Sequence, residues 1–284
     1  MPWRPPSNDR FYRLIVRTGL FLRWALQLDI QATGLEHLPA QGPARGPSRT
    51  AVRGDGAVFA VTHFGYVDFA VVELLLWRRA RAQLRFLVHQ GAADHWLSGP
   101  AISATGHVVV GYTGRADAYA AAVARLREGE YLAVFPEAGV SRSFTVRECR
   151  TGAVRMAAEA GVPVIPVSIW GAHRILTRGH GFSFRRSWRA PVRVHVDAPV
   201  VFPAGVDVEA ATEALRSTLQ AGIDRCIAGF PLRPGPGAWW MPARLGGGAP
   251  TDAERQLLDA ADAAAGRRRA PRTNARRTTL PRSK

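Results

Sequence analysis

Residues 57–80 read AVFAVTHFGYVDFAVVELLLWRRA and hold two kinds of regular structure in direct succession. Residues 57–62 form a short apolar run, which is the pattern of a strand buried on both faces. Residues 66–80 are mostly apolar and long enough for a helix. This stretch therefore predicts a buried strand that turns directly into a helix.

The same alternation continues to residue 228. The expected strands are 57–62, 84–88, 107–111, 131–135, 163–169 and 192–196. The expected helices are 66–80, 116–128, 151–160 and 207–228. Because strands that alternate with helices build parallel sheets covered by helices, the sequence predicts an α/β fold with a mostly parallel central sheet flanked by helices.

The composition is that of a folded protein with many loops. Of the 284 residues, 47% are hydrophobic and 21% charged, while 28 are glycine and 20 are proline. These proportions exclude a fully disordered chain, and two cysteines, Cys149 and Cys226, are too few for a disulfide scaffold. No apolar run reaches the roughly 18 residues of a membrane-spanning helix, so an ordinary transmembrane helix is not expected.

The chain is strongly basic, with 38 Lys and Arg against 22 Asp and Glu and a formal net charge of +16. Lys284 is the only lysine, so arginine carries nearly all of the positive charge. Residues 264–284 hold seven arginines and Lys284 without any acid. Since guanidinium groups bind phosphates and carboxylates in a flat two-point geometry, this balance favours nucleic acid, an anionic lipid or a phosphorylated substrate as partner.

Residues 10–28 have the pattern of an amphipathic helix. Arg13 and Arg23 lie on one side of it, and Phe21 and Leu22 lie among apolar residues on the opposite side. Arginines beside so much apolar surface favour a helix that lies in a membrane interface over one that spans the membrane. The alternative is a surface helix that docks on the domain through the same apolar residues.

Two stretches rich in Gly and Pro, 39–56 and 231–250, interrupt the alternation of strands and helices. The patterns along the whole chain indicate four expected parts. These are an amphipathic membrane-associated segment over 1–30, a main α/β domain over 31–230, a Gly/Pro-rich loop with a short helix over 231–265 and a disordered basic tail over 266–284.

His63 lies at the carboxyl end of the strand 57–62, where open α/β sheets bind their ligands. Asp68 follows in the first turn of the next helix, so the turning chain brings its carboxylate toward one imidazole nitrogen. Such a carboxylate fixes the tautomer and stabilises the imidazolium, which makes His63 a candidate general base for an alcohol. The alternative is a structural histidine before a helix, because this pattern alone is common.

A second apolar strand, within residues 131–143 (YLAVFPEAGVSRS), ends in a turn of small residues. Glu137 and Gly139 belong to this turn, and we expect Glu137 and the backbone donors of the turn at the same edge of the sheet as His63. Arg142 follows and is suited to bind an anion. The alternative is a strand-ending turn with an exposed glutamate.

A third segment, residues 106–115 (GHVVVGYTGR), joins a strand to a Gly-containing turn and to Arg115 at the start of a helix. An arginine beside helix-terminal amides is suited to bind a phosphate, and a solvated surface arginine is the alternative. A fourth segment, residues 161–167 (GVPVIPV), is an apolar strand between prolines without a reactive group. We expect it to line a pocket or to support the sheet.

Several well-known catalytic signatures are missing from the chain. It has no G-x-S-x-G nucleophile elbow, no Walker A loop, no G-x-G-x-x-G after a strand and no H-E-x-x-H zinc motif. Neither a metal site nor a covalent serine nucleophile of these types is therefore expected.

Together the four segments resemble the glycerolipid acyltransferase family, specifically the 1-acylglycerol-3-phosphate (lysophosphatidic acid) acyltransferases. That family has a His-x4-Asp block, a block with a phosphate-binding arginine, a Phe-Pro-Glu-Gly block and an apolar block with proline. The matching positions here, in order, are His63 with Asp68, residues 111–115, residues 135–137 and residues 162–166. The order and spacing agree within a similar region of about residues 30–225, so the main domain is expected to be an acyltransferase domain.

The match also has departures. The asparagine that precedes the histidine in the family is Thr62 here. The Gly-Thr-Arg that follows the glutamate is replaced by residues 138–141, with Arg142 two positions late. These changes keep the residues for acyl transfer and leave the identity of the acceptor open.

The resemblance implies transfer of an acyl group from acyl-CoA or acyl carrier protein to the hydroxyl of a lysophospholipid, with no other cofactor. His63, oriented by Asp68, would deprotonate this hydroxyl, which then attacks the thioester carbonyl. The oxyanion would be bound by backbone N–H groups near the Glu137 turn, and arginines would hold the acceptor phosphate. The residues assigned to substrate binding are Arg115, Glu137, Gly139 and Arg142. The product would be phosphatidic acid, made by a peripheral protein on the cytoplasmic face of the cell membrane.

Two alternatives stay open. The same chemistry on a different polar lysolipid fits the altered third block. A non-enzymatic binder of nucleic acid or anionic membrane would use the basic tail for electrostatic affinity, but it would not account for the four ordered blocks. Because that tail has no aromatic residue for base stacking, we expect an anionic membrane surface and no specific nucleic acid as partner.

Overall fold

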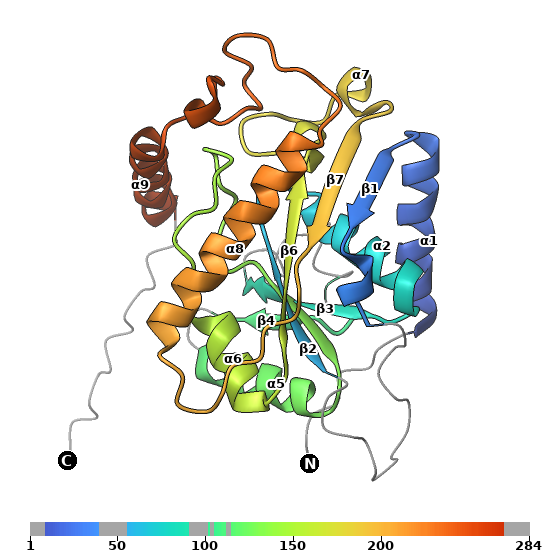
Figure 1. The fold of residues 1–284 in the computed structure, drawn as a ribbon, viewed down its shortest axis with the longest axis vertical. Coiled ribbons are helices and arrows are strands. Elements are labelled where there is room, and N and C mark those ends of the chain that lie inside the picture. Colours follow the sequence, from blue (N-terminus) through green and yellow to red (C-terminus); the bar gives the residue numbers. More distant parts are fainter. Residues whose placement is uncertain (1–8, 40–55, 91–101, 103–104, 112–114, 270–284) are drawn as a thin grey trace, which may run out of the picture.

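The computed structural model describes residues 9–39, 56–90, 102, 105–111 and 115–269. Within them, seven strands form one sheet in the order β1-β7-β6-β2-β5-β3-β4 (Figure 1). The strands are β1 (Asp29–Thr33), β2 (Ala57–Val61), β3 (Leu84–His89), β4 (Val108–Val110), β5 (Tyr131–Val134), β6 (Val164–Trp170) and β7 (Pro191–Val196). Neighbouring strands are parallel except β6 and β7, which are antiparallel. The expected α/β fold with a mostly parallel sheet is confirmed.

Helices cover both faces of the sheet (Figure 1). They are α1 (Asp9–Ala25), α2 (Asp68–Ala80), α5 (Arg115–Arg127), α6 (Gly152–Ala160), α7 (Phe184–Ser187), α8 (Val208–Ala228) and α9 (Asp252–Arg269). Short 3-10 turns lie at Leu35–His37, Ala172–Arg174 and Ala243–Leu245. Helices α5, α6 and α8 pack on one face, and α2 packs on the other.

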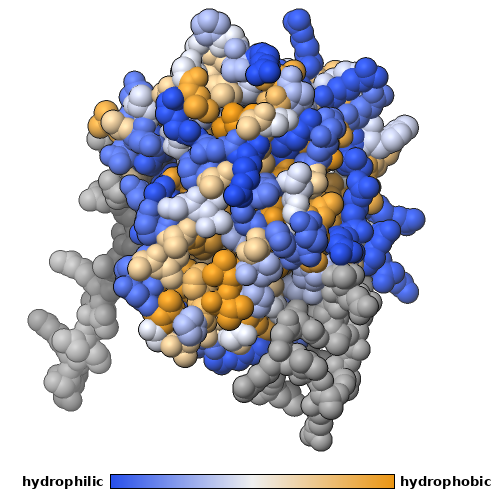
Figure 2. Space-filling view, in the orientation of Figure 1, coloured by the Kyte–Doolittle hydropathy of each residue, from blue (hydrophilic) through white to orange (hydrophobic). Residues whose placement is uncertain are grey.

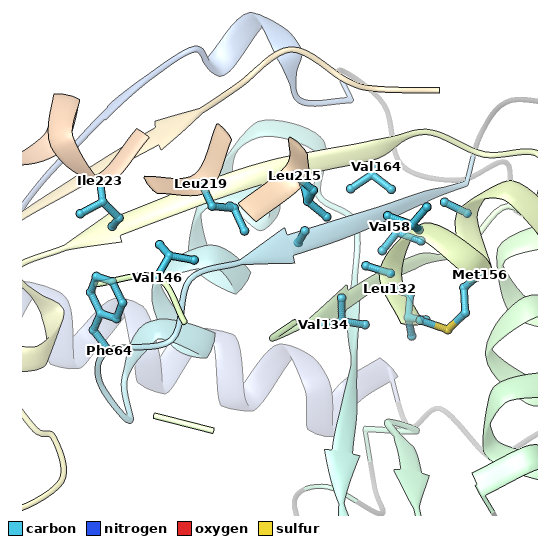
Figure 3. Packing of buried hydrophobic residues seen from close by; sticks show 14 of the residues in the cluster. Val58, Phe64, Leu132, Val134, Val146, Met156, Val164, Leu215, Leu219 and Ile223 are labelled. Carbon is cyan, nitrogen blue, oxygen red and sulfur yellow. The ribbon is translucent and has the colours of Figure 1, made fainter. Parts of the chain in front are cut away.

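The core is built from alternate side chains of the central strands. Val58 and Ala60 of β2 pack with α5, α6 and α8, whereas Phe59 and Val61 pack with α2. Because this central strand is covered on both faces, all of its residues are buried and its sequence is an uninterrupted apolar run. Figure 3 shows one side of this packing, with labelled residues that include Val58, Leu132, Val164, Leu215 and Leu219.

Each strand and helix expected between residues 57 and 228 is present, with ends that differ by at most two residues. Strand β1 was not expected. Its sequence, DIQAT, is short and polar, and its residues alternate between exposed and half-buried because it lies at the edge of the sheet beyond β7. The sheet therefore already begins at Asp29, before the expected start of the main domain at residue 31.

Helix α1 docks on α2, but not through the apolar residues that the pattern indicated. Tyr12 and Val16 are buried in a cluster with Leu74 and Trp77 of α2, and the ring centroids of Tyr12 and Trp77 are 5.7 Å apart. The exposed large apolar residues of α1 are Leu14, Phe21, Leu22 and Trp24. The helix thus uses one face for docking and presents a second apolar face to solvent.

No helix in the described part of the chain is both long and apolar enough to cross a membrane. The face of the molecule in Figure 2 is largely hydrophilic, with hydrophobic residues gathered near its lower edge, over α6 and the start of α8. Since every folded protein exposes some apolar surface, this group does not by itself indicate a membrane contact.

The C-terminal region departs from expectation at one point. The short helix expected over 251–265 is α9, and it continues to Arg269, into the stretch expected to be a disordered tail. Alanine and arginine are strong helix formers, which accounts for the extension. Residues 270–284 of that tail lie outside the described residues, as do residues 40–55 of the expected loop 39–56.

Candidate active site

The loop between β2 and α2 carries the candidate base. Strand β2 ends at Val61, and His63 follows at its carboxyl end. Asp68 is the first residue of α2, and its Oδ2 lies 3.3 Å from Nδ1 of His63. The predicted approach of these two side chains is present in the structure.

Asp68 is held by the backbone of the same loop. Its Oδ2 accepts hydrogen bonds from the N–H groups of Phe64 (2.8 Å) and Gly65 (2.7 Å), and its side chain is buried. Burial raises the pKa of Asp68, while the hydrogen bonds from His63 and from the two amides act in the opposite direction. A carboxylate here keeps the ring proton on Nδ1 of His63 and leaves Nε2 as the acceptor.

Gly65 lets this loop pass close to the chain that follows β6. A Cβ at position 65 would lie 2.8 Å from Cα of His173, so a larger residue would displace the backbone. The hydroxyl of Thr177 donates a hydrogen bond of 2.5 Å to the carbonyl oxygen of Phe64. The loop that carries His63 is therefore fixed by a segment distant in sequence.

The side chain of Glu137 contacts the backbone of the loop that carries His63. Its side chain is buried, Oε1 accepts a hydrogen bond of 2.8 Å from the N–H of His63, and Oε2 accepts one of 3.1 Å from the N–H of Arg147. Burial raises the pKa of Glu137 to about 8, and these two amides oppose the rise. Glu137 lies at the edge of the sheet beside His63, as expected, and its burial excludes the alternative of an exposed glutamate.

Phe135, which follows β5, supports the imidazole. The rings of His63 and Phe135 stack with centroids 4.0 Å apart and planes 20° from parallel. The ring of Phe86 in β3 also stacks with Phe135, with centroids 6.0 Å apart. The His63 side chain stays 17% exposed, so one side of the ring is packed and part of it is accessible to a substrate.

Thr62 points into the sheet. Its hydroxyl accepts a hydrogen bond of 2.9 Å from the N–H of Ile169 in β6, and the side chain is fully buried. This residue stands where the similar family has asparagine, and here it joins two strands. The departure therefore leaves the contact between His63 and Asp68 intact.

Arg142 belongs to a cluster of arginines covered by α9. Arg142 and Arg178 each pair with Asp259 and Asp262 of that helix, and Arg147 pairs with Asp259. Arg147 and Arg178 were not predicted, because in a chain this rich in arginine neither has a distinctive spacing. No sequence pattern indicated that α9 would lie over this loop.

Arg115 and Gly139 are the two remaining residues predicted to bind substrate. Arg115 is the first residue of α5, but its side chain and residues 112–114 lie outside the described residues, so its phosphate-binding role stays a prediction. Gly139 lies in the turn after Glu137, where a Cβ would come within 3.3 Å of Nη1 of Arg147. The small residue thus lets this arginine pass close to the turn.

Cys149, on the loop that follows the turn, is unsuited to act as a nucleophile. Burial raises the pKa of its thiol to about 12, and only the thiolate attacks efficiently. Both Cys149 and Cys226 are free cysteines. The site chemistry among the described residues therefore rests on the pair of His63 and Asp68.

Comparisons with known proteins bear on the family and the fold of this chain. A family model described as "Acyltransferase" matches residues 29–170, from β1 to the end of β6. The fold is similar to the crystal structure of the 1-acyl-sn-glycerophosphate (LPA) acyltransferase PlsC from Thermotoga maritima, with a TM-score of 0.58 and 20% sequence identity over 78% of this chain and 81% of that one. No curated protein matches the chain at a significant level. Because the family model spans half of the chain and includes both His63 and Asp68, this protein belongs to the acyltransferase family.

Proposed function

We propose that this acyltransferase moves a fatty acyl group from an acyl thioester to the free hydroxyl of lysophosphatidic acid, giving phosphatidic acid in phospholipid synthesis. The observation that carries the proposal is the contact between His63 and Asp68 at the carboxyl end of β2. The match to the acyltransferase family supports the chemistry. The shared fold with a lysophosphatidic acid acyltransferase supports the choice of acceptor.

The reaction proceeds without a covalent enzyme intermediate. Nε2 of His63 takes the proton of the acceptor hydroxyl as the oxygen attacks the thioester carbonyl. Asp68, at 3.3 Å from Nδ1, stabilises the imidazolium that forms. The tetrahedral intermediate then expels the thiolate, which receives the proton back from Nε2. One ester bond forms, one thioester bond breaks, and the histidine returns to its starting state.

Glu137 is a positioning residue in this scheme. Its contacts with the N–H groups of His63 and Arg147 join the two loops on either side of the reacting groups. The oxyanion is bound by backbone N–H groups of the turn after Glu137, which includes Gly139. Such preorganised donors stabilise the charge that develops in the transition state.

The acceptor phosphate is bound by Arg142 and Arg115. Arg142 directly follows Ser141, whose N–H donates a hydrogen bond of 2.8 Å to the carbonyl oxygen of His63. Arg115 begins a helix, where the first N–H groups and the helix dipole favour an anion. A phosphate held on this side would present the neighbouring hydroxyl to the histidine.

The donor is acyl-CoA or acyl carrier protein, and no cofactor takes part. The exposed Phe21 and Trp24 of α1, beside the exposed Arg13 and Arg17, would rest in an anionic membrane surface. The proposed location is the cytoplasmic face of the cell membrane, where the protein would act as a peripheral enzyme. A lysolipid acceptor resides in that same surface, so an interfacial enzyme reaches it directly.

The test is an acyl-transfer assay with purified protein and a His63→Ala control. Both donors are crossed with lysophosphatidic acid and with lysolipids that carry other head groups. We expect lysophosphatidic acid to give the highest kcat/KM, and the His63→Ala protein to transfer the acyl group at least about 10²-fold more slowly. Preference for another lysolipid would replace the acceptor and keep the chemistry, as the altered turn at residues 138–141 allows. No transfer with any pair would refute the proposal.

A further inference from the structure

Three guanidinium groups gather beside the candidate active site and face the same helix. Nη2 of Arg178 lies 3.0 Å from Oδ2 of Asp262, and Nη1 of Arg147 lies 3.5 Å from Oδ2 of Asp259. Arg142 pairs with both aspartates. Figure 1 shows α9 at the edge of the molecule, next to the loop that follows β5. Three positive charges therefore meet two negative charges from α9.

Each of these arginines is tied to the loop of His63. The tie runs through a hydrogen bond made by the arginine's own backbone or by the residue just before it. Two of these bonds reach the loop directly, Ser141 N to His63 O (2.8 Å) and Thr177 Oγ1 to Phe64 O (2.5 Å). The third, Arg147 N to Glu137 Oε2 (3.1 Å), reaches it through Glu137, whose Oε1 accepts a hydrogen bond of 2.8 Å from the N–H of His63. The cluster is thus built into the same rigid loops as the candidate base, so an anion bound by it lies next to the site.

The charges of the three arginines are paired with carboxylates, but several polar atoms of the cluster lack a hydrogen-bond partner among the described residues. Nε of Arg142, Nε of Arg147 and Oδ1 of Asp259 are buried and have no hydrogen-bond partner among the described residues. A phosphate monoester carries up to two negative charges and three strong acceptor oxygens. It therefore matches the charge of the two carboxylates and offers more acceptors to the fixed guanidinium donors.

Helix α9 is attached by ion pairs and by hydrogen bonds from the hydroxyls of Ser143 and Thr145 to Oδ1 of Asp252, and not by apolar burial. From Asp252 to Ala264 the only buried residue is Arg255, and Leu257 is 73% exposed. Arg255 pairs with Asp252 and Asp259 of its own helix. Because partly exposed ion pairs contribute little stability and are weakened by salt, such a helix is displaced far more easily than one that packs into the core.

We infer that α9 is a built-in competitor: the carboxylates of Asp259 and Asp262 occupy an anion-binding site formed by Arg142, Arg147 and Arg178, and a phosphate monoester displaces them. The chain closes this site by itself until a phosphate-bearing ligand enters. The affinity for that ligand is then lower than the arginines alone would give, because only the open fraction of the protein binds it. The inference concerns anion binding and does not depend on which lipid accepts the acyl group.

Amide hydrogen exchange on the full chain tests the displacement. Inorganic phosphate should speed exchange over residues 252–264 of the wild-type protein, and sodium chloride at the same ionic strength should speed it less. Exchange over α6, which does not pair with the cluster, serves as the internal reference. If phosphate leaves exchange in α9 unchanged at concentrations where calorimetry shows it bound, the inference is wrong.

Charge-neutral variants test the competition. The double variant Asp259→Asn, Asp262→Asn should bind inorganic phosphate about 5- to 30-fold more tightly than the wild type, since two partly exposed carboxylates no longer compete for the arginines. Its α9 should exchange rapidly without phosphate. The control is Glu36→Gln, Glu209→Gln, which removes two exposed carboxylates away from the cluster. Equal tightening in both double variants would refute competition and indicate a general charge effect. If the aspartate variant does not fold, the hydrogen-exchange measurement on the wild-type protein alone tests the inference.

A second arm identifies the source of the phosphate. Vesicles of phosphatidylcholine are compared with and without lysophosphatidic acid, beside free inorganic phosphate. Release of α9 by both sources, or by the lysolipid vesicles alone, supports the inference and assigns the ligand; release by neither overturns it. Acyl transfer is not a readout here, so a protein that releases α9 but transfers no acyl group would refute the proposed function alone.

Discussion

The backbone N–H of His63 donates a hydrogen bond of 2.8 Å to Oε1 of Glu137. The two residues follow β2 and β5, which are neighbouring parallel strands, so they reach the same edge of the sheet. The other oxygen of Glu137 accepts a hydrogen bond from Arg147. One buried carboxyl therefore joins the loop of the candidate base to the loop of the arginines.

Replacing His63 by alanine should lower kcat by about 10²- to 10⁴-fold, the usual contribution of a general base. The fold should survive, because the side chain is partly exposed and its loop is held by backbone contacts. Steady-state kinetics beside circular dichroism measure both effects. His37→Ala, which removes a half-buried histidine elsewhere, is the matched control. A His63→Ala enzyme with more than about a tenth of wild-type kcat would remove the histidine from this role.

Asp68→Asn should keep the shape of the loop and still lose much of the activity. The amide cannot stabilise the imidazolium, and it favours the wrong tautomer of His63. We expect a large fall in kcat with little change in donor KM, and the double variant with His63→Ala should be no slower than His63→Ala alone. Additive losses in the double variant would show that the two residues act separately.

Glu137→Gln should change how stability depends on pH. Burial raises the pKa of Glu137 to about 8 from 4.5. A carboxyl with a raised folded-state pKa stabilises the folded protein fully below its unfolded pKa, and this contribution is lost as pH rises through the folded pKa. The free energy of unfolding should therefore fall from about pH 5 to about pH 8 in the wild type. Urea titrations should show a shallower fall for Glu137→Gln, and equal slopes would contradict the assignment.

Arg115→Ala should weaken binding of a phosphorylated acceptor. Loss of one charge-assisted contact costs roughly 1.5–3 kcal/mol, or about 10- to 150-fold in acceptor KM. The KM of the donor should change less, and an acceptor without phosphate should be unaffected. Arg127→Ala, at the other end of α5 and 56% exposed, is the control. An equal loss on acceptors with and without phosphate would exclude a phosphate contact by Arg115.

The exposed face of α1 can be tested without disturbing its docked face. Phe21→Ser with Trp24→Ser should reduce sedimentation with anionic vesicles, because 60% and 72% of these residues are exposed. Thermal stability should hardly change, since Tyr12 and Val16 hold the helix on α2. The matched control is Val201→Ser with Leu257→Ser, two exposed apolar residues elsewhere. Unchanged sedimentation would show that α1 is a surface helix only.

Local patterns in the sequence determined the elements of the sheet and the central pair of residues. Strands buried on both faces read as apolar runs such as residues 57–61, and the helices between them follow the same alternation. The contact of His63 with Asp68 was predictable for the same reason. The two residues are separated by a single strand-to-helix turn, so local geometry brings them together.

Only the tertiary structure decided the contacts between segments far apart in the chain. Glu137 contacts His63 because β5 lies beside β2 in the sheet. The sequences of these two strands do not specify that they are neighbours. The aspartates of α9 meet Arg142 because a polar helix is placed by long-range charge pairing, and no spacing in the sequence encodes such pairing. The docked face of α1 and the polar edge strand β1 were likewise decided by neighbouring elements, because amphipathic helices and edge strands become stable only when a partner surface is already in place.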